Sequence, residues 1–188
     1  FVGDLGTSLK MRGQEINDII FTRFPISARI GALAVLVAIC VGVPLGSVAA
    51  LNRGKLPDNG IMFIATLGIA VPGFVVATTL MYAFGVKLHI LPTYGLTSPL
   101  HYILPVSALA FYPTAYISRL MRSSMLDILG QDYMRTARAK GISQFKSLFK
   151  HALRNAVLPV VTYLGPMLAY ILTGSFVVEK IFTIPGLG

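Results

Sequence analysis

The chain has 188 residues, of which 55% are hydrophobic, only 12% are charged and none is tryptophan. Its mean hydropathy is +0.74. A soluble domain carries about 25% charged residues because its surface must be solvated, so the composition excludes a soluble fold and predicts a membrane protein. The net charge of +9 would suggest nucleic-acid binding in a soluble chain. In a membrane chain the position of the basic residues matters instead, because they concentrate in cytoplasmic loops. The single cysteine, Cys40, excludes a disulfide framework.

Residues 1–25 form a mixed polar segment, which we expect to be external. Four apolar segments follow, and each predicts a membrane-spanning helix: 26–51, 60–86, 102–118 and 156–178. A helix needs roughly 20 residues to cross about 30 Å of hydrocarbon. The third segment reaches that length only if it continues to Arg122, with the arginine side chains snorkelling to the headgroups.

Proline and glycine occur inside these segments and predict helix breaks near a pathway: Pro44, Pro72, Gly73, Pro113 and Pro166. Repeated breaks favour a bundle around a translocation pathway, because neighbouring helices or water must satisfy the freed backbone groups. The alternative is that both residue types are simply common in spanning helices.

Polar side chains at mid-depth have two interpretations, hydrogen bonds between helices or contacts with a substrate. We expect the first for most of them: Ser47, Thr66, Thr78, Thr79, Ser107, Thr114, Tyr116, Thr162, Tyr163, Tyr170 and Thr173. Arg29 is the one charge within a predicted span and either snorkels outward or faces the pathway. No carboxylate lies mid-span, which argues against a proton- or sodium-coupled carrier.

The basic residues define the topology. Loops 52–59 and 119–155 together hold ten of the 16 Lys and Arg residues, whereas 87–101 holds only Lys87. The positive-inside rule places the two basic loops in the cytoplasm and both ends of the chain outside. External ends and the absence of an initiator methionine lead us to expect an internal piece of a longer protein.

The long loop 119–155 contains two predicted helices. Residues 132–140 are rich in helix formers, Gly141 suits a helix end, and apolar residues including Phe145 then recur at spacings of three and four. Three interpretations stay open at this point: an amphipathic surface on anionic lipid, a docking site for a cytoplasmic protein, and a poorly supported nucleic-acid patch.

Two stretches of this loop carry a resemblance to a known family. Tyr133-Met-Arg-Thr-Ala-Arg-Ala-Lys-Gly141 and His151-Ala-Leu-Arg-Asn-Ala-Val-Leu-Pro159 resemble the signature loop of ABC-transporter permeases of the binding-protein-dependent type. Arg135 stands where the general family pattern has Glu, which is typical of the peptide/nickel branch. Segments 3–8 and 174–188 resemble external segments of the same branch, and the first of them resembles the B-type oligopeptide or dipeptide permease.

The resemblance implies an all-α, polytopic transmembrane bundle of the type I ABC importer permease kind, with residues 1–188 as one partial domain carrying helices two to five. It implies a transport subunit, not an enzyme, in the bacterial inner membrane. Its expected partners are a second permease, two cytoplasmic ATPase subunits, an external substrate-binding protein and membrane lipid. Residues 132–148 would dock the ATPase, with eight coupling residues: Tyr133, Arg135, Thr136, Ala137, Arg138, Gly141, Phe145 and His151.

The chain contains no Gly-x4-Gly-Lys-Ser/Thr phosphate loop, so ATP and Mg are expected in the partner ATPase and no cofactor or metal is expected in this chain. The alternative function is a stand-alone secondary carrier or channel with a basic lipid-binding loop. The sequence does not identify the cargo, because relatives carry oligopeptides, dipeptides, nickel or glutathione.

Overall fold

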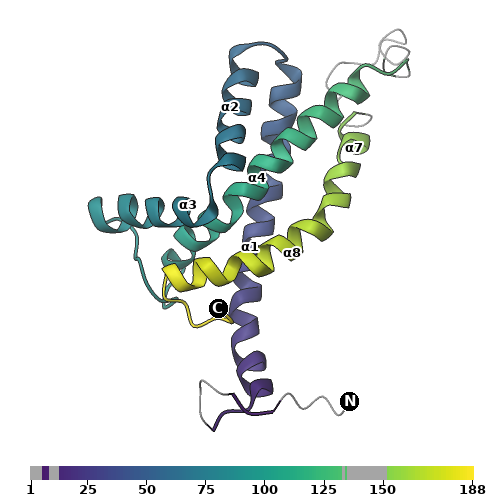
Figure 1. Cartoon of the computed structure of the whole chain (residues 1–188). Coiled ribbons are helices and arrows are strands. Elements are labelled where there is room, and N and C mark those ends of the chain that lie inside the picture. Colours follow the sequence, from purple (N-terminus) through teal and green to yellow (C-terminus); the bar gives the residue numbers. More distant parts are fainter. Residues whose placement is uncertain (1–5, 9–12, 133, 135–151) are drawn as a thin grey trace. The chain divides into compact units, whose positions relative to one another are not determined.

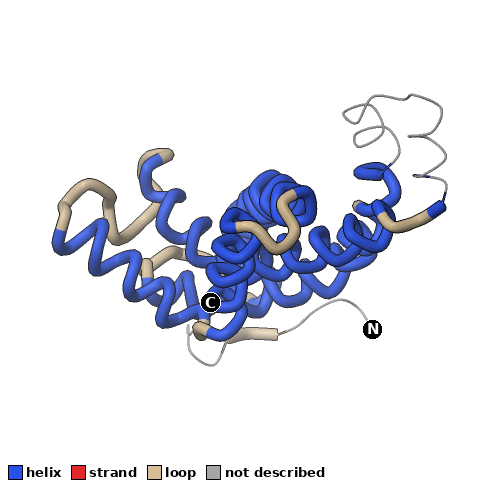
Figure 2. The backbone as a smooth tube through the Cα atoms, turned by 90° about the horizontal axis from the view of Figure 1, so that it is seen from above, coloured by secondary structure: helices blue, strands red, loops and turns tan. Residues whose placement is uncertain are grey.

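The computed structural model describes residues 6–8, 13–132, 134 and 152–188 (Figure 1). These residues are helical or loop, apart from an isolated bridge between Thr7 and Glu15 (Figure 2). The predicted all-α class is therefore confirmed. The described helices are α1 (Ile16–Leu51), α2 (Leu56–Ala70), α3 (Gly73–Leu80), the π-helix η1 (Met81–Lys87), α4 (Leu100–Leu129), α7 (Leu153–Ala156) and α8 (Leu158–Ile181).

The turn between α1 and α2 follows from its residues. Gly54 has a φ of +74°, a left-handed conformation that favours glycine. α2 then begins with a proline in its first turn. The N–H groups of a first turn have no carbonyl partner within the helix, so the N–H that proline lacks costs no hydrogen bond. The helix ends at Ala70 because Pro72 pushes the preceding residue, Val71, into an extended conformation with φ −82° and ψ 126°.

The expected breaks at three prolines need correction. α1 runs without interruption through Pro44, α4 through Pro113 and α8 through Pro166. An internal proline removes one N–H donor, and a long helix can accommodate that loss with a bend instead of an end. The helical structure is interrupted only at Val71–Pro72, directly before Gly73, among the five positions predicted as breaks.

The chain forms two compact units. The first comprises Phe1–Ala34, Gly73–Leu109 and Tyr170–Gly188, and the second comprises Val35–Pro72 and Ala110–Ala169. In the first unit, Ile30, Ile171 and Phe182 are among the buried side chains.

The end of the first unit is held by side-chain hydrogen bonds. The N–H of Gly188 donates to Oε2 of the buried Glu179 at 2.8 Å, and the N–H of Leu187 donates to Oγ of the buried Ser27 at 3.0 Å. Gly186 lies so close to the Glu179 carboxylate that a Cβ at this position would clash with it. The other carboxylate oxygen of Glu179, Oε1, is buried without a hydrogen-bond partner among the described residues.

Two described helical stretches are long and apolar enough to cross a membrane, Ile16–Leu51 and Leu153–Ile181. A third is obtained if the broken pair Leu56–Ala70 and Gly73–Lys87 counts as one span. α4, which contains the expected span 102–118, has 30 residues but is not in this set, so its crossing stays a prediction. Large apolar side chains are exposed on these helices, including Leu36, Phe63 and Phe176, as expected for helices that face lipid.

Candidate functional site

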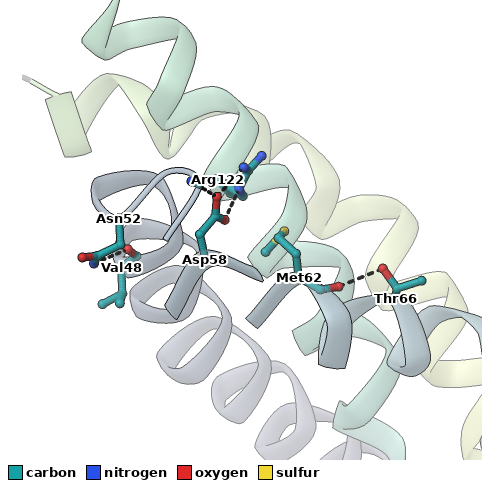
Figure 3. A network of polar contacts seen from close by, with 7 residues as sticks. Val48, Asn52, Asp58, Met62, Thr66 and Arg122 are labelled. Atoms are coloured by element: carbon teal, nitrogen blue, oxygen red, sulfur yellow. Dashed lines mark hydrogen bonds and ion pairs between the residues drawn. The ribbon is translucent and has the colours of Figure 1, made fainter. Parts of the chain in front are cut away.

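A buried ion pair joins the start of α2 to the last third of α4. Arg122 donates to Asp58 through two nitrogens, with Nε 2.5 Å from Oδ1 and Nη2 2.7 Å from Oδ2 (Figure 3). The Asp58 side chain is 1% exposed and that of Arg122 is 27% exposed. A carboxylate this deeply buried requires a partner, because an isolated buried charge is strongly destabilising. The fork of the guanidinium supplies that partner with two parallel hydrogen bonds.

The turn before α2 completes this arrangement. The N–H of Gly54 donates to Oδ2 of Asp58 at 2.9 Å, so both carboxylate oxygens accept hydrogen bonds. Asp58 precedes the expected span 60–86, and Arg122 follows the expected span 102–118. Two hydrogen bonds from the Arg122 guanidinium and one from the N–H of Gly54 stabilise the ionised form of this carboxylate.

A polar cavity of about 380 Å³ lies beside the ion pair. Residues of α2 and α4 line it: Asp58, Asn59, Met62, Thr66, Arg119, Arg122 and Ser123. The α2 residues Asp58, Met62 and Thr66 are four positions apart and therefore share one face of the helix (Figure 3). The cavity thus combines two guanidinium groups with a single carboxylate.

Glycines allow α1 and α2 to approach α4 closely in the second unit. A Cβ at Gly42 would lie 2.8 Å from Cγ2 of Ile117, and a Cβ at Gly46 would clash with the carbonyl oxygen of Ser118. A Cβ at Gly68 would lie 2.6 Å from that of Ala115. Gly42 and Gly46 have the small-xxx-small spacing that lets membrane helices approach closely.

Five of the mid-depth hydroxyl groups donate hydrogen bonds within their own helices. Those of Ser47, Thr66, Thr78, Thr114 and Thr162 each donate to the carbonyl four residues earlier, at distances of 2.7 to 3.1 Å. The expectation of hydrogen bonds between helices is therefore wrong for these five O–H groups, each of which donates within its own helix. The carbonyl of the preceding turn is already within reach of a hydroxyl rotor in a helix, so no neighbouring helix is needed.

Tyrosine rings of α4 and α8 pack against one another in the second unit. The rings of Tyr116 and Tyr163 stack with their centroids 4.3 Å apart, and those of Tyr112 and Tyr116 lie 6.3 Å apart. These distances suit offset aromatic pairs, so Tyr116 and Tyr163 link α4 to α8 through ring packing.

Arg29 lies in the first unit, at a second cavity. It is the only charged residue among those that line this mostly apolar space of about 650 Å³, which also includes Leu33, Ser98 and Tyr102. The side chain is exposed. Both earlier interpretations of Arg29, snorkelling and a pathway role, are compatible with this position.

The eight predicted coupling residues lie outside the described residues: Tyr133, Arg135, Thr136, Ala137, Arg138, Gly141, Phe145 and His151. The ion pair was missed by sequence reasoning, which assigned Arg122 to snorkelling. One signal was available, since Asp58 is an acidic residue in an otherwise basic loop, directly before an apolar segment. Its partner is 64 positions away, which no local pattern reveals.

Lipid-facing apolar helices, close glycine packing and basic loops together define a multi-pass helical membrane protein. The family model described as "Binding-protein-dependent transport system inner membrane component" matches residues 42–188, more than half of the chain. The chain therefore belongs to this family, and the resemblance predicted from the loop sequence is confirmed.

Relatives extend the match to almost the whole chain. The dipeptide transport system permease protein DppB of Bacillus subtilis is 50% identical over 185 residues, covering 98% of this chain and 60% of the relative. The oligopeptide transport system permease protein OppB of Haemophilus influenzae is 43% identical over 188 residues, covering 99% of this chain and 61% of the relative. The chain thus spans about three fifths of the length of these relatives, which are named as transport permeases and not as enzymes.

A solved structure shares the fold. The crystal structure of an amino acid ABC transporter with histidines matches with a TM-score of 0.68 and 18% sequence identity, covering 91% of this chain and 75% of that chain. At this identity the match concerns the fold alone. It confirms the prediction of a type I ABC importer permease fold.

Proposed function

We propose that the chain is part of a permease subunit of an ATP-driven importer of dipeptides or oligopeptides in a bacterial cytoplasmic membrane. The observation that carries the proposal is the 50% identity to a dipeptide permease over 98% of the chain. The oligopeptide permease at 43% identity supports the same substrate class. The subunit would form half of a translocation pathway, with a second permease forming the other half.

ATP would be hydrolysed by two separate cytoplasmic subunits that dock on the loop 132–148. The support for this docking site is the loop's resemblance to the family signature and its position in a basic stretch that the positive-inside rule predicts to be cytoplasmic. Closure of the ATPase pair would then move the permease halves between inward-facing and outward-facing states. An external binding protein would deliver the peptide.

The prolines and glycine predicted near the pathway belong to this proposal too. The interruption at Pro72 and Gly73 leaves backbone groups without helical partners, and such irregular backbone is tolerated at membrane depth where it lines a cavity or is buried in protein. We propose that this interruption lies beside the pathway, whereas Pro44, Pro113 and Pro166 lie within continuous helices.

The test is uptake of a labelled dipeptide into cells or vesicles that carry the complete transporter, with the permease tagged for purification. The expected result is that an ATPase co-purifies in stoichiometric amount and that uptake stops when ATP is depleted. Uptake that survives ATP depletion, with no ATPase attached, would instead establish a secondary carrier or channel. A labelled free amino acid and Ni²⁺ serve as competing cargoes, and preferential uptake of either would overturn the peptide assignment.

A further inference from the structure

The polar cavity between α2 and α4 contains a cation, Arg119, that no described residue neutralises. Both oxygens of Asp58 already accept hydrogen bonds from Arg122 and from the N–H of Gly54. Arg119 lines the same cavity, is exposed, and forms no ion pair with any residue that the structure describes. Two guanidinium groups against one carboxylate leave the cavity with one net positive charge.

The other lining residues suit an anion with attached apolar groups. Arg119, Arg122 and Ser123 lie three and four positions apart, so they share one face of α4. Asn59 and Ser123 add an amide and a hydroxyl group, both of which can donate hydrogen bonds, and Met62 adds an apolar surface. Guanidinium groups bind phosphate through paired hydrogen bonds, and Arg122 has further N–H donors beyond the two that reach Asp58.

The position of the cavity in the sequence indicates which phosphate it would meet. Asn59 directly precedes the expected span 60–86, and Arg119 directly follows the expected span 102–118. On this predicted topology both lie at headgroup level, on the side of the membrane that holds the basic loops. Basic pockets between spanning helices on this side are suited to anionic lipid headgroups.

We propose that the cavity lined by Arg119, Arg122, Asn59 and Ser123 binds the phosphate of an anionic phospholipid in the cytoplasmic leaflet. Arg119 supplies the charge that attracts the headgroup, and the Asp58–Arg122 pair fixes the second guanidinium in place. The bound lipid would brace α2 against α4 at the membrane surface. The site does not depend on which solute the protein carries.

The test is a thermal-stability titration of the purified, delipidated permease in mild detergent. One arm adds phosphatidylglycerol, a second adds phosphatidylcholine and a third adds inorganic phosphate. Because a ligand that binds only the folded state raises the unfolding temperature, each titration gives an apparent affinity. Phosphatidylglycerol is expected to stabilise the protein more strongly than phosphatidylcholine, and inorganic phosphate is expected to have little effect because it lacks the acyl chains.

Two matched variants locate the binding site. Arg119→Gln should weaken the apparent affinity for phosphatidylglycerol by about fivefold, the effect of roughly one basic side chain near an anionic surface. Arg154→Gln removes an exposed arginine that does not line the cavity, and it should change the affinity by less than about twofold. Arg119 is exposed, so its replacement should leave the fold intact in the absence of lipid.

Three results would overturn the proposal. Equal losses in the Arg119 and Arg154 variants would show diffuse attraction to basic loops instead of a site. Equal stabilisation by phosphatidylcholine would show that the headgroup charge is irrelevant. Stabilisation by inorganic phosphate that also requires Arg119 would identify the ligand as a free phosphate anion and exclude the lipid.

Discussion

At the scale of single residues, Asp58 and Arg122 are unequal partners. Asp58 is 1% exposed and cannot turn to water, whereas Arg122 is 27% exposed and can. Loss of the arginine leaves a buried charge unpaired, and loss of the carboxylate leaves a cation that can reach solvent. The two single variants should therefore differ in severity, although they break the same ion pair.

We expect Arg122→Gln to lower the free energy of unfolding by about 3 kcal/mol, and Asp58→Asn by about 1–2 kcal/mol. The asparagine keeps an oxygen that can accept the hydrogen bond from Gly54. Denaturant unfolding of the permease in detergent measures both values. Arg154→Gln, an exposed arginine on α7, is the matched control and should fall within about 0.5 kcal/mol of the parent. Equal losses in the two ion-pair variants would contradict the asymmetry.

The same pair shows why the site was only partly predictable. The side chain of an arginine at the end of an apolar segment can either extend to the lipid headgroups or pair with a buried carboxylate. The local sequence is the same in both cases. The choice depends on which residue of another helix lies opposite, and that is set by helix packing across 64 positions. By contrast, Arg119 has no ion-pair partner among the described residues, which agrees with its predicted place at the membrane surface.

At the scale of helices, glycine contacts set how closely α1 approaches α4. Gly46 faces backbone as well as side chain, since a Cβ there would meet the carbonyl oxygen of Ser118 and Cβ of Met121. Backbone atoms of a continuous helix cannot move aside as the end of a flexible side chain can. A methyl group at Gly46 must therefore separate the helices.

We predict that Gly46→Ala lowers the free energy of unfolding by about 1–3 kcal/mol, the usual range for overpacking. Gly60→Ala is the control, because no described atom beyond its chain neighbours and the adjacent backbone of its own helix lies within 4 Å of its Cβ position. There the alanine should be neutral or stabilising by up to about 1 kcal/mol, since glycine disfavours a helix interior. Thermal unfolding of the two variants side by side distinguishes a packing effect from a propensity effect. A stabilising Gly46→Ala would disprove the close approach.

Glu179 lies near the C-terminal end of α8 and holds the segment that follows the helix. It accepts the N–H of Gly188, and Ser27 accepts the neighbouring N–H of Leu187, so the segment after the helix folds back over it. Glu179→Ala should release this segment and speed amide hydrogen exchange at residues 186–188 by roughly tenfold, corresponding to the loss of one hydrogen bond.

The control for this prediction is Lys180→Ala, which removes an exposed charge from the next position. Exchange in α4 serves as an internal reference and should be equal in both variants. If Lys180→Ala accelerates exchange in 186–188 as much as Glu179→Ala does, the carboxylate has no special part in holding the segment.

Helix positions were more predictable than helix ends. The apolar runs indicated where helices lie, because membrane crossing demands a length of apolar residues that the sequence displays directly. α1, however, begins at Ile16, ten positions before the expected start of its apolar run, since polar residues can continue a helix beyond the hydrocarbon. Prolines were also poor indicators, because Pro44 and Pro72 have the same chemistry but only Pro72 lies at an interruption.

At the scale of the whole molecule, the proposed docking loop has to transmit the ATPase cycle to the helices. Gly141→Leu, Arg135→Glu and Arg138→Glu should each uncouple ATP hydrolysis from uptake while membrane insertion stays normal. We expect uptake to fall by roughly tenfold or more, the effect of losing about 1.4 kcal/mol at an interface. Peptide uptake and ATPase activity are measured on the same preparation of the assembled transporter.

Lys87→Glu is the matched charge reversal, placed in the loop predicted to be external. It should leave the coupling ratio unchanged. Normal uptake in all three loop variants would reject the coupling assignment, whereas loss of membrane insertion would point to a role of the loop in biogenesis.

The hydroxyl groups that bond within their own helices have a consequence for how the protein reaches the membrane. Ser47, Thr66, Thr78, Thr114 and Thr162 are satisfied by carbonyls of their own helix, so these hydroxyl groups need no neighbouring helix when their segments enter lipid. Gly42, Gly46 and Gly68 matter only at a later stage, when the inserted helices pack closely against one another. During synthesis, the late-emerging α8 therefore need not be complete for α1 to leave the translocation machinery.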